Sequence, residues 1–136
     1  GSDDRGNSVQ QTTDGGYIFT GVYNDDMIVS KTDGVGNEEW NKTYEGHGYS
    51  VIQSNDNGFV ITGVIYNSNG QPGLFLIKTD SDGNEQWNKT SGIGNYLGFF
   101  IEKTSDNGFI ITGKMTGEYL NESILLLKTD SQGNFE

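Results

Sequence analysis

The stretch DSDGN at residues 80–84 places oxygen-bearing side chains at alternate positions, as a calcium-binding loop does. The closing glutamate of the full twelve-residue loop is missing, and two similar stretches carry Val35 and Gln132 where this one carries Asp82. All three share a Gly-Asn pair, and these residue types supply the positive φ angles that tight turns demand. We therefore interpret the three stretches as turns and predict no metal site.

A second candidate is a lysine followed by Thr-Asp, which occurs as Lys31, Lys78 and Lys128. Three such cations could ring a surface that binds an acidic ligand. The alternative is a local role, in which each ammonium group pairs with a nearby carboxylate and the aliphatic stem lies along the sheet. An aspartate lies two residues further on in every copy, which favours the local role.

Two tryptophans, Trp40 and Trp87, occupy the same place in successive copies of one phrase. An exposed tryptophan could stack on a sugar ring. A large aromatic ring repeated at one position is more typical of packing between neighbouring repeats. We predict this packing role for both residues.

The sequence offers few residues for catalysis. His47 is the only histidine and is expected in a loop at residues 45–49, so neither a three-histidine metal site nor a Ser-His-Asp relay can be assembled. The 19 acidic residues could supply a pair for glycoside cleavage, but none recurs in an apolar setting. We predict that the protein is not an enzyme and has no catalytic, cofactor-binding or metal-binding residues and no cofactor.

These candidates belong to a sequence that repeats itself three times. The phrase KTDGVGNEEWNKT begins at Lys31, KTDSDGNEQWNKT begins 47 residues later, and KTDSQGNFE begins a further 50 residues on. A second phrase precedes each copy, as DGGYIFTG from Asp14, DNGFVITG from Asp56 and DNGFIITG from Asp106. Self-similarity with spacings of 42–50 residues indicates a repeat architecture, in which small units gain stability by stacking on one another.

Each repeat predicts four strands joined by tight turns. The apolar runs are rich in Ile, Val, Phe and Tyr and the chain has no alanine, which favours strands over helices. The second and third strands are apolar at nearly every position, which indicates cover on both faces. The expected ranges are 8–12, 50–54 and 100–104 for the first strand, 17–22, 59–64 and 109–114 for the second, 27–30, 74–77 and 124–127 for the third, and 38–44 and 85–91 for the fourth.

Four antiparallel strands per unit, apolar on both faces and repeated at this period, are the pattern of a β-propeller blade. We predict an all-β fold with three blades in one propeller segment. The blades are residues 3–44, 45–91 and 92–136, the last without its outer strand. A β-sandwich is the alternative, but its strands would show one polar face.

The phrases DGGYIFTG and KTDSDGNEQWNKT resemble the propeller repeats of archaeal and bacterial surface proteins, and more distantly the tryptophan-bearing blades of quinoprotein-type propellers. The resemblance covers the chain from Ser8 onward. It implies that the first strand of each blade lines a central channel, that the fourth strand is outermost, and that Trp40 and Trp87 pack between blades. Quinone use is not implied, because the cofactor-binding and metal-ligating residues of the enzymatic members have no counterparts here.

Propellers usually close with four to eight blades, so three blades would leave two apolar blade faces open. We expect one of two arrangements. Either two copies of the chain close a six-bladed ring with twofold symmetry, or the chain is a segment of a longer protein that supplies further blades. The Gly1-Ser2 start, typical of a tag remnant, and the short last repeat fit a segment.

The composition of the chain limits the kinds of partner that it could bind. A net charge of -11 disfavours nucleic acid and anionic membrane surfaces, and no apolar run is long enough to span a bilayer. We predict a non-enzymatic scaffold or binding module of a surface or secreted protein, whose loops recognise a protein or a glycan. The alternatives are a fragment whose main property is assembly into a closed ring and, from a third class, an enzyme domain. The loops expected at the rims are residues 44–49, 66–73, 91–97 and 116–123, and N-glycosylation triplets begin at Asn41, Asn88 and Asn121.

Overall fold

The computed structural model describes residues 3–91, 96–116 and 121–136. Within these residues the chain forms eleven antiparallel strands in three sheets and no helix, which confirms the predicted all-β class. It follows that the described part holds no helix able to cross a membrane. The strands are β1 (Arg5–Gln11), β2 (Tyr17–Tyr23), β3 (Asp26–Thr32), β4 (Glu38–Tyr44), β5 (His47–Gln53), β6 (Phe59–Tyr66), β7 (Pro72–Thr79), β8 (Glu85–Ser91), β9 (Tyr96–Lys103), β10 (Phe109–Thr116) and β11 (Glu122–Thr129).

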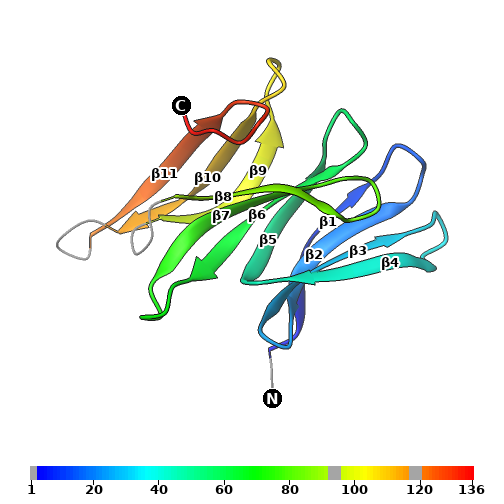
Figure 1. The fold of residues 1–136 in the computed structure, drawn as a ribbon, viewed down its shortest axis with the longest axis horizontal. Coiled ribbons are helices and arrows are strands. Elements are labelled where there is room, and N and C mark those ends of the chain that lie inside the picture. The colour runs from blue at the N-terminus through cyan, green and yellow to red at the C-terminus, as the bar shows by residue number, and fades with distance from the viewer. Residues whose placement is uncertain (1–2, 92–95, 117–120) are drawn as a thin grey trace.

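Each sheet is a meander, because strands that follow one another in the chain are also neighbours in the sheet. Strands β1–β4 form sheet 1, β5–β8 form sheet 2, and β9–β11 form sheet 3 (Figure 1). The hairpin between the first two strands of sheet 2 turns at Asn57, whose φ is 64°, and closes with a bond from the Ser54 N–H to the Gly58 carbonyl. Asn57 therefore supplies the positive φ that this tight hairpin requires.

The turn between the third and fourth strands is built around an aspartate. The Asp80 carboxylate accepts hydrogen bonds from the backbone N–H groups of Asp82 and Asn84, at 2.9 and 2.8 Å, and from the Asn84 side chain at 3.0 Å. These bonds, led by that of the Asn84 side chain, lower the pKa of Asp80. The same three bonds recur around Asp33 and Asp130. The turn interpretation of the DSDGN stretch is therefore confirmed.

The first strand of each sheet begins earlier than predicted. Pairing between β5 and β6 already includes His47 with Val64 and Gly48 with Gly63, and the register then shifts before Ser50. Equivalent shifts occur in sheets 1 and 3. A β-bulge adds an unpaired residue and breaks the two-residue alternation by which strands are recognised in a sequence. The prediction that His47 lies in a loop is thus wrong, since it opens β5 and its ring contacts that of Tyr66.

Glycine at the bulge is a steric requirement. A Cβ atom on Gly63 would overlap the carbonyl oxygen of His47 on the neighbouring strand. A Cβ atom on its partner Gly48 would overlap the side chain of Thr20 and lie 3.0 Å from Cγ of Met27, both in the preceding sheet. Each DGGYIFTG-type phrase ends in a Thr-Gly pair. The glycine of this pair faces the backbone of the adjacent strand, and in sheets 1 and 2 the threonine faces the bulge glycine of the following sheet.

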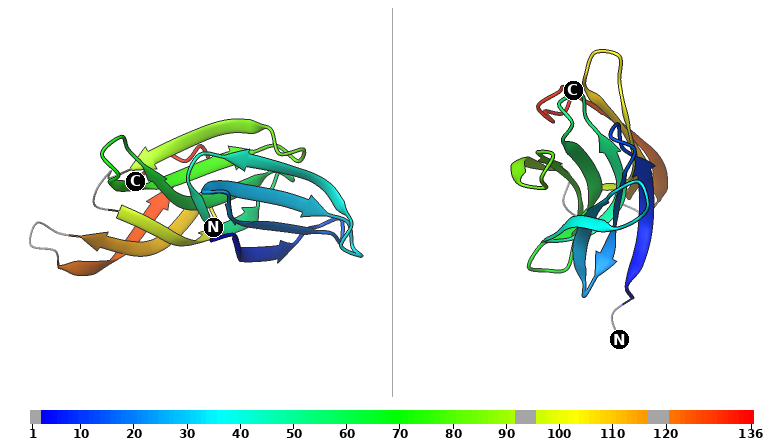
Figure 2. Two further views of the ribbon diagram at one scale, coloured as in Figure 1. Left: turned by 90° about the horizontal axis from the view of Figure 1, so that it is seen from below. Right: turned by 90° about the vertical axis from the view of Figure 1, so that its right-hand side faces the viewer.

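The three sheets stack face to face in a row, with sheet 2 between sheets 1 and 3 (Figure 2). Between sheets 1 and 2 the core is built from Ile18, Met27, Val29, Val51, Phe59, Ile61, Phe75 and Ile77. Between sheets 2 and 3 it is built from Ile52, Val60, Leu74, Leu76, Ile101, Phe109, Ile111 and Leu125. Alternate residues of β6 and β7 thus serve opposite cores, so the middle sheet is apolar on both faces. Three layers of this kind are incompatible with the two-sheet sandwich considered above.

Candidate functional site

Two grooves that share several repeat-equivalent residues lie between neighbouring sheets, on the edge that carries the first and third turns of each sheet. The first groove, between sheets 1 and 2, has a volume of about 640 Å³. The second, between sheets 2 and 3, has a volume of about 260 Å³. Repeat-equivalent residues line both, with Asp14, Lys31, Phe59 and Ser81 of the first groove matched by Asp56, Lys78, Phe109 and Ser131 of the second. The residues that repeat in the sequence therefore form similar grooves at successive sheet interfaces.

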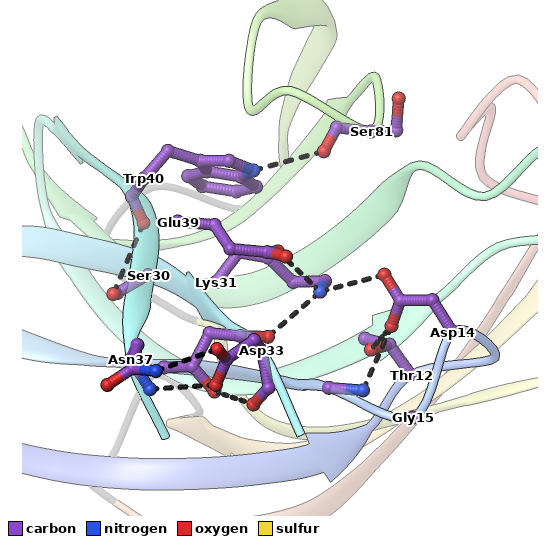
Figure 3. A network of polar contacts seen from close by, with 12 residues as sticks. Thr12, Asp14, Gly15, Ser30, Lys31, Asp33, Asn37, Glu39, Trp40 and Ser81 are labelled. Atoms are coloured by element: carbon purple, nitrogen blue, oxygen red, sulfur yellow. Dashed lines mark hydrogen bonds and ion pairs between the residues drawn. The ribbon is translucent and has the colours of Figure 1, made fainter. Parts of the chain in front are cut away.

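The buried lysine of the first groove sits at the centre of a polar network (Figure 3). Lys31 Nζ lies 2.9 Å from a carboxylate oxygen of Asp14 and 2.8 Å from one of Glu39. It also donates to the carbonyl oxygen of Thr32 at 2.9 Å. These three acceptors match the three N–H groups of an ammonium ion. Lys31 therefore ties the first hairpin of sheet 1 to its third and fourth strands.

The network recurs in the other two sheets. Lys78 Nζ donates to both carboxylate oxygens of Asp56, at 3.0 and 2.9 Å, and to the side-chain oxygen of Gln86. Lys128 Nζ lies 2.6 Å from carboxylate oxygens of Asp106 and Glu136. Lys31 and Lys78 are buried, whereas Lys128 is partly exposed at the open face of sheet 3. The structure thus confirms local pairing of the lysines and does not aim them at a common ligand.

The aspartates of these networks are held in the ionised form. For Asp14, hydrogen bonds from Thr12, Lys31 and the backbone N–H of Gly16 lower the pKa. Burial acts to raise the pKa of Asp56, but bonds from Ser54, Lys78 and Gly58 outweigh it and lower the value to about 2. Burial likewise opposes the charge of Lys31, but its bonds to Glu39 and Asp14 raise the pKa. A fully bonded, protonated lysine is poorly suited to act as a nucleophile or a base.

A carboxylate with a lowered pKa makes stability depend on pH. Asp56 stabilises the fold above its unfolded pKa of 3.8, and this contribution disappears as the pH falls through the folded value of about 2. We expect Asp56→Asn to lower the melting temperature at pH 7, with a cost of about 1 kcal/mol because the carboxylate is more than half exposed. The difference from the unmodified chain should fade between roughly pH 4 and pH 2. Melting curves that remain equally separated down to pH 2 would show that this ion pair has no such role.

Both tryptophans extend to the next sheet. The Trp40 indole donates its N–H to the carbonyl oxygen of Ser81 at 3.2 Å, and its ring lies 5.8 Å from that of Phe59. A Cβ atom on Gly83 would come within 2.7 Å of the Trp40 ring, and one on Gly133 would come within 2.5 Å of the Trp87 ring. Each tryptophan is therefore partly buried and lies against the glycine turn of the following sheet.

Sequence reasoning missed two residues that join the sheets. The Tyr44 hydroxyl donates to the carbonyl oxygen of Gly83, and burial, with the charges of Glu85 and Asp80, raises its pKa to about 12. The Gln53 side chain accepts a bond from the backbone N–H of Thr13 at 2.9 Å. Glutamine occurs at this place in the first two repeats, so the repeat alignment held a signal for Gln53.

The other predicted surface features are distributed over the molecule. Asn41 and Asn88 are exposed on β4 and β8, the last strands of their sheets, and Asn121 is exposed just before β11. Among the predicted rim loops, residues 67–71 form a tight turn at the opposite end of sheet 2 from the grooves. Residues 92–95 and 117–120, which make up half or more of the predicted loops 91–97 and 116–123, lie outside the described part of the chain.

The groove lining determines what could bind. In the first groove, the carboxylates of Asp14, Glu39 and Asp82 outnumber the ammonium group of Lys31, so an anionic ligand would be repelled. Carboxylate and amide oxygens accept hydrogen bonds from hydroxyl groups, and aromatic edges offer apolar contact. The described residues include no cluster of three or more acidic or histidine side chains that could hold a metal ion. No protein-family model matches the chain, and no curated protein sequence matches it.

Proposed function

We propose that the chain is a non-enzymatic β-propeller segment that serves as a scaffold and binding module of a surface or secreted protein. Its rigid stacked sheets would hold one row of turns and grooves for recognition of a glycan or a protein. The observation that carries the proposal is the recurrence of one groove, built from equivalent residues, between each pair of neighbouring sheets. Loops on a rigid frame are a common place for recognition.

The way the sheets approach one another supports a propeller. Strand β5 contacts β1, β2 and β3 of the preceding sheet, and β9 contacts β5, β6 and β7 in the same way. The first strand of each sheet is thus the one held most closely against its neighbour, as expected if the first strands gather around a common axis. The resemblance to propeller repeats of surface proteins and the exposed acceptor asparagines on β4 and β8 support a location outside the cell.

The hydrogen bonding of the groove supports binding over catalysis. The ammonium groups of Lys31 and Lys78 use their donors on carboxylates, amides and backbone carbonyls of their own sheet, and Lys103, which also lines the second groove, donates to the side chain of Asn55. The remaining exposed groups, such as Thr13, Asn57 and Ser81, are suited to hydrogen bonding with a neutral polar ligand. A neutral glycan fits this lining better than an acidic one.

A second candidate function is assembly itself, in which the chain exists to form a closed ring. The observation in its favour is that apolar residues are exposed on the outward faces of sheets 1 and 3. A surface of this kind marks an interaction site more often than a solvated face.

Glycan-array binding tests the groove directly. We expect the purified chain to bind a neutral glycan, and we expect Thr13→Arg/Ser81→Arg to weaken this binding at least 10-fold, because two long cations would fill the mouth of the first groove. Both positions are exposed, so the variant should melt at nearly the same temperature as the unmodified chain.

The matched control is Ser68→Arg/Asn69→Arg, which adds the same charge to the turn at the opposite end of sheet 2. It should leave glycan binding unchanged. Loss of binding in the control, with retention in the groove variant, would move recognition to the other rim. An array without a neutral ligand would remove glycan recognition from the proposal.

A further inference from the structure

The two end faces of the stack carry the residue types of the internal interfaces but are open to solvent. In each sheet, the leading face is the one turned toward the next sheet along the chain, and the trailing face is the opposite one. On the leading face of sheet 2, Leu74 and Leu76 are fully buried against sheet 3. Their counterparts on the leading face of sheet 3 are Ile124 and Leu126, which are 87% and 68% exposed.

The trailing faces show the complementary pattern. Val51 of sheet 2 and Ile101 of sheet 3 are buried against the preceding sheet. The equivalent residue of sheet 1 is Val9, which is 67% exposed. Phe59 and Phe109 are buried as well, whereas their counterpart Tyr17 is 37% exposed. One uncovered leading face and one uncovered trailing face therefore lie at the two ends of the stack. Inside the stack, a leading face and a trailing face together form each interface.

A glycine at the bulge shows how these two halves would fit. A Cβ atom on Gly48 would overlap Thr20 and lie 3.0 Å from Met27 of sheet 1, and one on Gly98 would lie 2.5 Å from Thr62 and 3.1 Å from Leu74 of sheet 2. The first glycine of the series is Gly6, which has nothing within 4 Å of its Cβ position. Met27, Leu74 and Ile124 occupy the same position in the third strands of sheets 1, 2 and 3.

The structure contains a matching hollow. A depression of about 420 Å³ on the trailing face of sheet 1 is lined by Gly6, Asn7, Ser8, Val9 and Phe19. In the internal interfaces the corresponding place is filled by the leading-face residues Met27 and Leu74. Ile124 holds the same repeat position as Met27 and Leu74, and it is exposed at the other end of the stack. It is therefore the side chain expected to fill this depression.

We propose that the leading face of sheet 3 binds the trailing face of sheet 1 in a second copy of this chain, with Ile124 seated on Gly6. Two such joints, related by a twofold axis, close a ring of six sheets and leave no end face open. The inference rests on the stacked-blade arrangement proposed above and is independent of what the grooves bind. It specifies the orientation of self-association, because each joint pairs two different faces.

One polar contact of the internal joints can also form at the new joint. Inside the stack, the Gln10 side chain of sheet 1 accepts a bond from the backbone N–H of Gln53 at 2.7 Å. At the new joint the residue in the place of Gln10 is Glu102, and the residue in the place of Gln53 is Gln11. The Glu102 carboxylate would accept the same bond. One position differs, since Phe100 stands where the internal joints use Ser8 and Ser50 to accept backbone bonds.

Molecular mass in solution, measured by light scattering, tests the joint. The unmodified chain should have twice the mass of one chain. Ile124→Asp should weaken association at least 100-fold because it would bury a carboxylate in an apolar seat, and Gly6→Leu should do the same by filling the hollow. Both sites are open in a single chain, so circular dichroism should show an unchanged sheet signal. Val35→Asp is the control, since it removes another exposed apolar residue and introduces the residue that sheet 2 carries at the equivalent turn position, Asp82.

Mixing the two variants distinguishes this joint from a pairing of identical faces. The Ile124→Asp chain keeps its trailing face on sheet 1, and the Gly6→Leu chain keeps its leading face on sheet 3. One intact joint should therefore form in the mixture, and a species with the mass of two chains should reappear. A monomeric unmodified chain, open-ended polymers, or a mixture that stays monomeric would each overturn the proposal. None of these outcomes bears on glycan binding, which is measured at the groove.

Discussion

Gly63→Ala is expected to lower the free energy of unfolding by about 3 kcal/mol or more, one of the two largest effects predicted for this chain. The added methyl group would overlap the carbonyl oxygen of His47, which belongs to the backbone of the adjacent strand and cannot rotate away. Relief would require β5 and β6 to separate at the bulge, in the middle of the most buried sheet. Urea denaturation followed by tryptophan fluorescence would measure the loss.

The control for this substitution is Gly6→Ala, measured in dilute solution where only contacts within one chain count. Gly6 lies at the bulge of sheet 1, in the repeat position of Gly48, and its Cβ position is open. The unfolding free energy should change by less than about 1 kcal/mol. Equal effects at the two glycines would mean that backbone flexibility, not the close approach of His47, determines the cost at Gly63.

Leu76→Ala is expected to cost about 2–5 kcal/mol, the range for truncating a fully buried leucine. Leu76 lies in the core between sheets 2 and 3, so the cavity would be enclosed on both sides. The chain provides its own control at the equivalent position of sheet 3, because Leu126 is mostly exposed. Leu126→Ala should change the stability of the isolated chain by about 0.5 kcal/mol or less.

Comparing these two leucine variants tests the stacking order. The two residues share a repeat position and differ in whether another sheet follows. Thermal unfolding at low protein concentration should therefore separate them clearly. Similar losses for both would contradict a stack in which sheet 3 is the last layer of the single chain.

Turns and the later strands of each repeat could be predicted from the sequence because local chemistry determines them. The fourth strands were predicted at residues 38–44 and 85–91, which are the bounds of β4 and β8. The Asp-x-x-Gly-Asn turn needs only its own side chains, since Asp80 bonds to Asp82 and Asn84. Apolar residues at successive positions of β6 and β7 correctly indicated a sheet covered on both faces.

Features that depend on how two sheets approach each other could not be predicted. The early start of β5 follows from a bulge whose cause is the pairing of Gly48 with Gly63, and a strand pattern does not reveal such a shift. The role of Tyr44 could not be predicted because its partner is the carbonyl oxygen of Gly83 in another repeat. Every residue has a backbone carbonyl, so the residue type at position 83 does not indicate this bond. The lysines gave a partial signal, since the KTD phrase indicated a carboxylate partner but not that Asp14 and Asp56 would provide it.

The lysine networks have a consequence for how such a chain could evolve. Lys31 finds its partners within residues 14–39, and Lys78 within residues 56–86, so each ionic cluster is inherited whole with its own repeat. Duplication or deletion of a complete repeat would therefore leave no buried lysine without its carboxylate partner. Loss of half a repeat would leave one buried lysine unpaired. Gene changes that respect this unit should yield folded chains of different length, which makes the number of sheets an evolvable property of the protein.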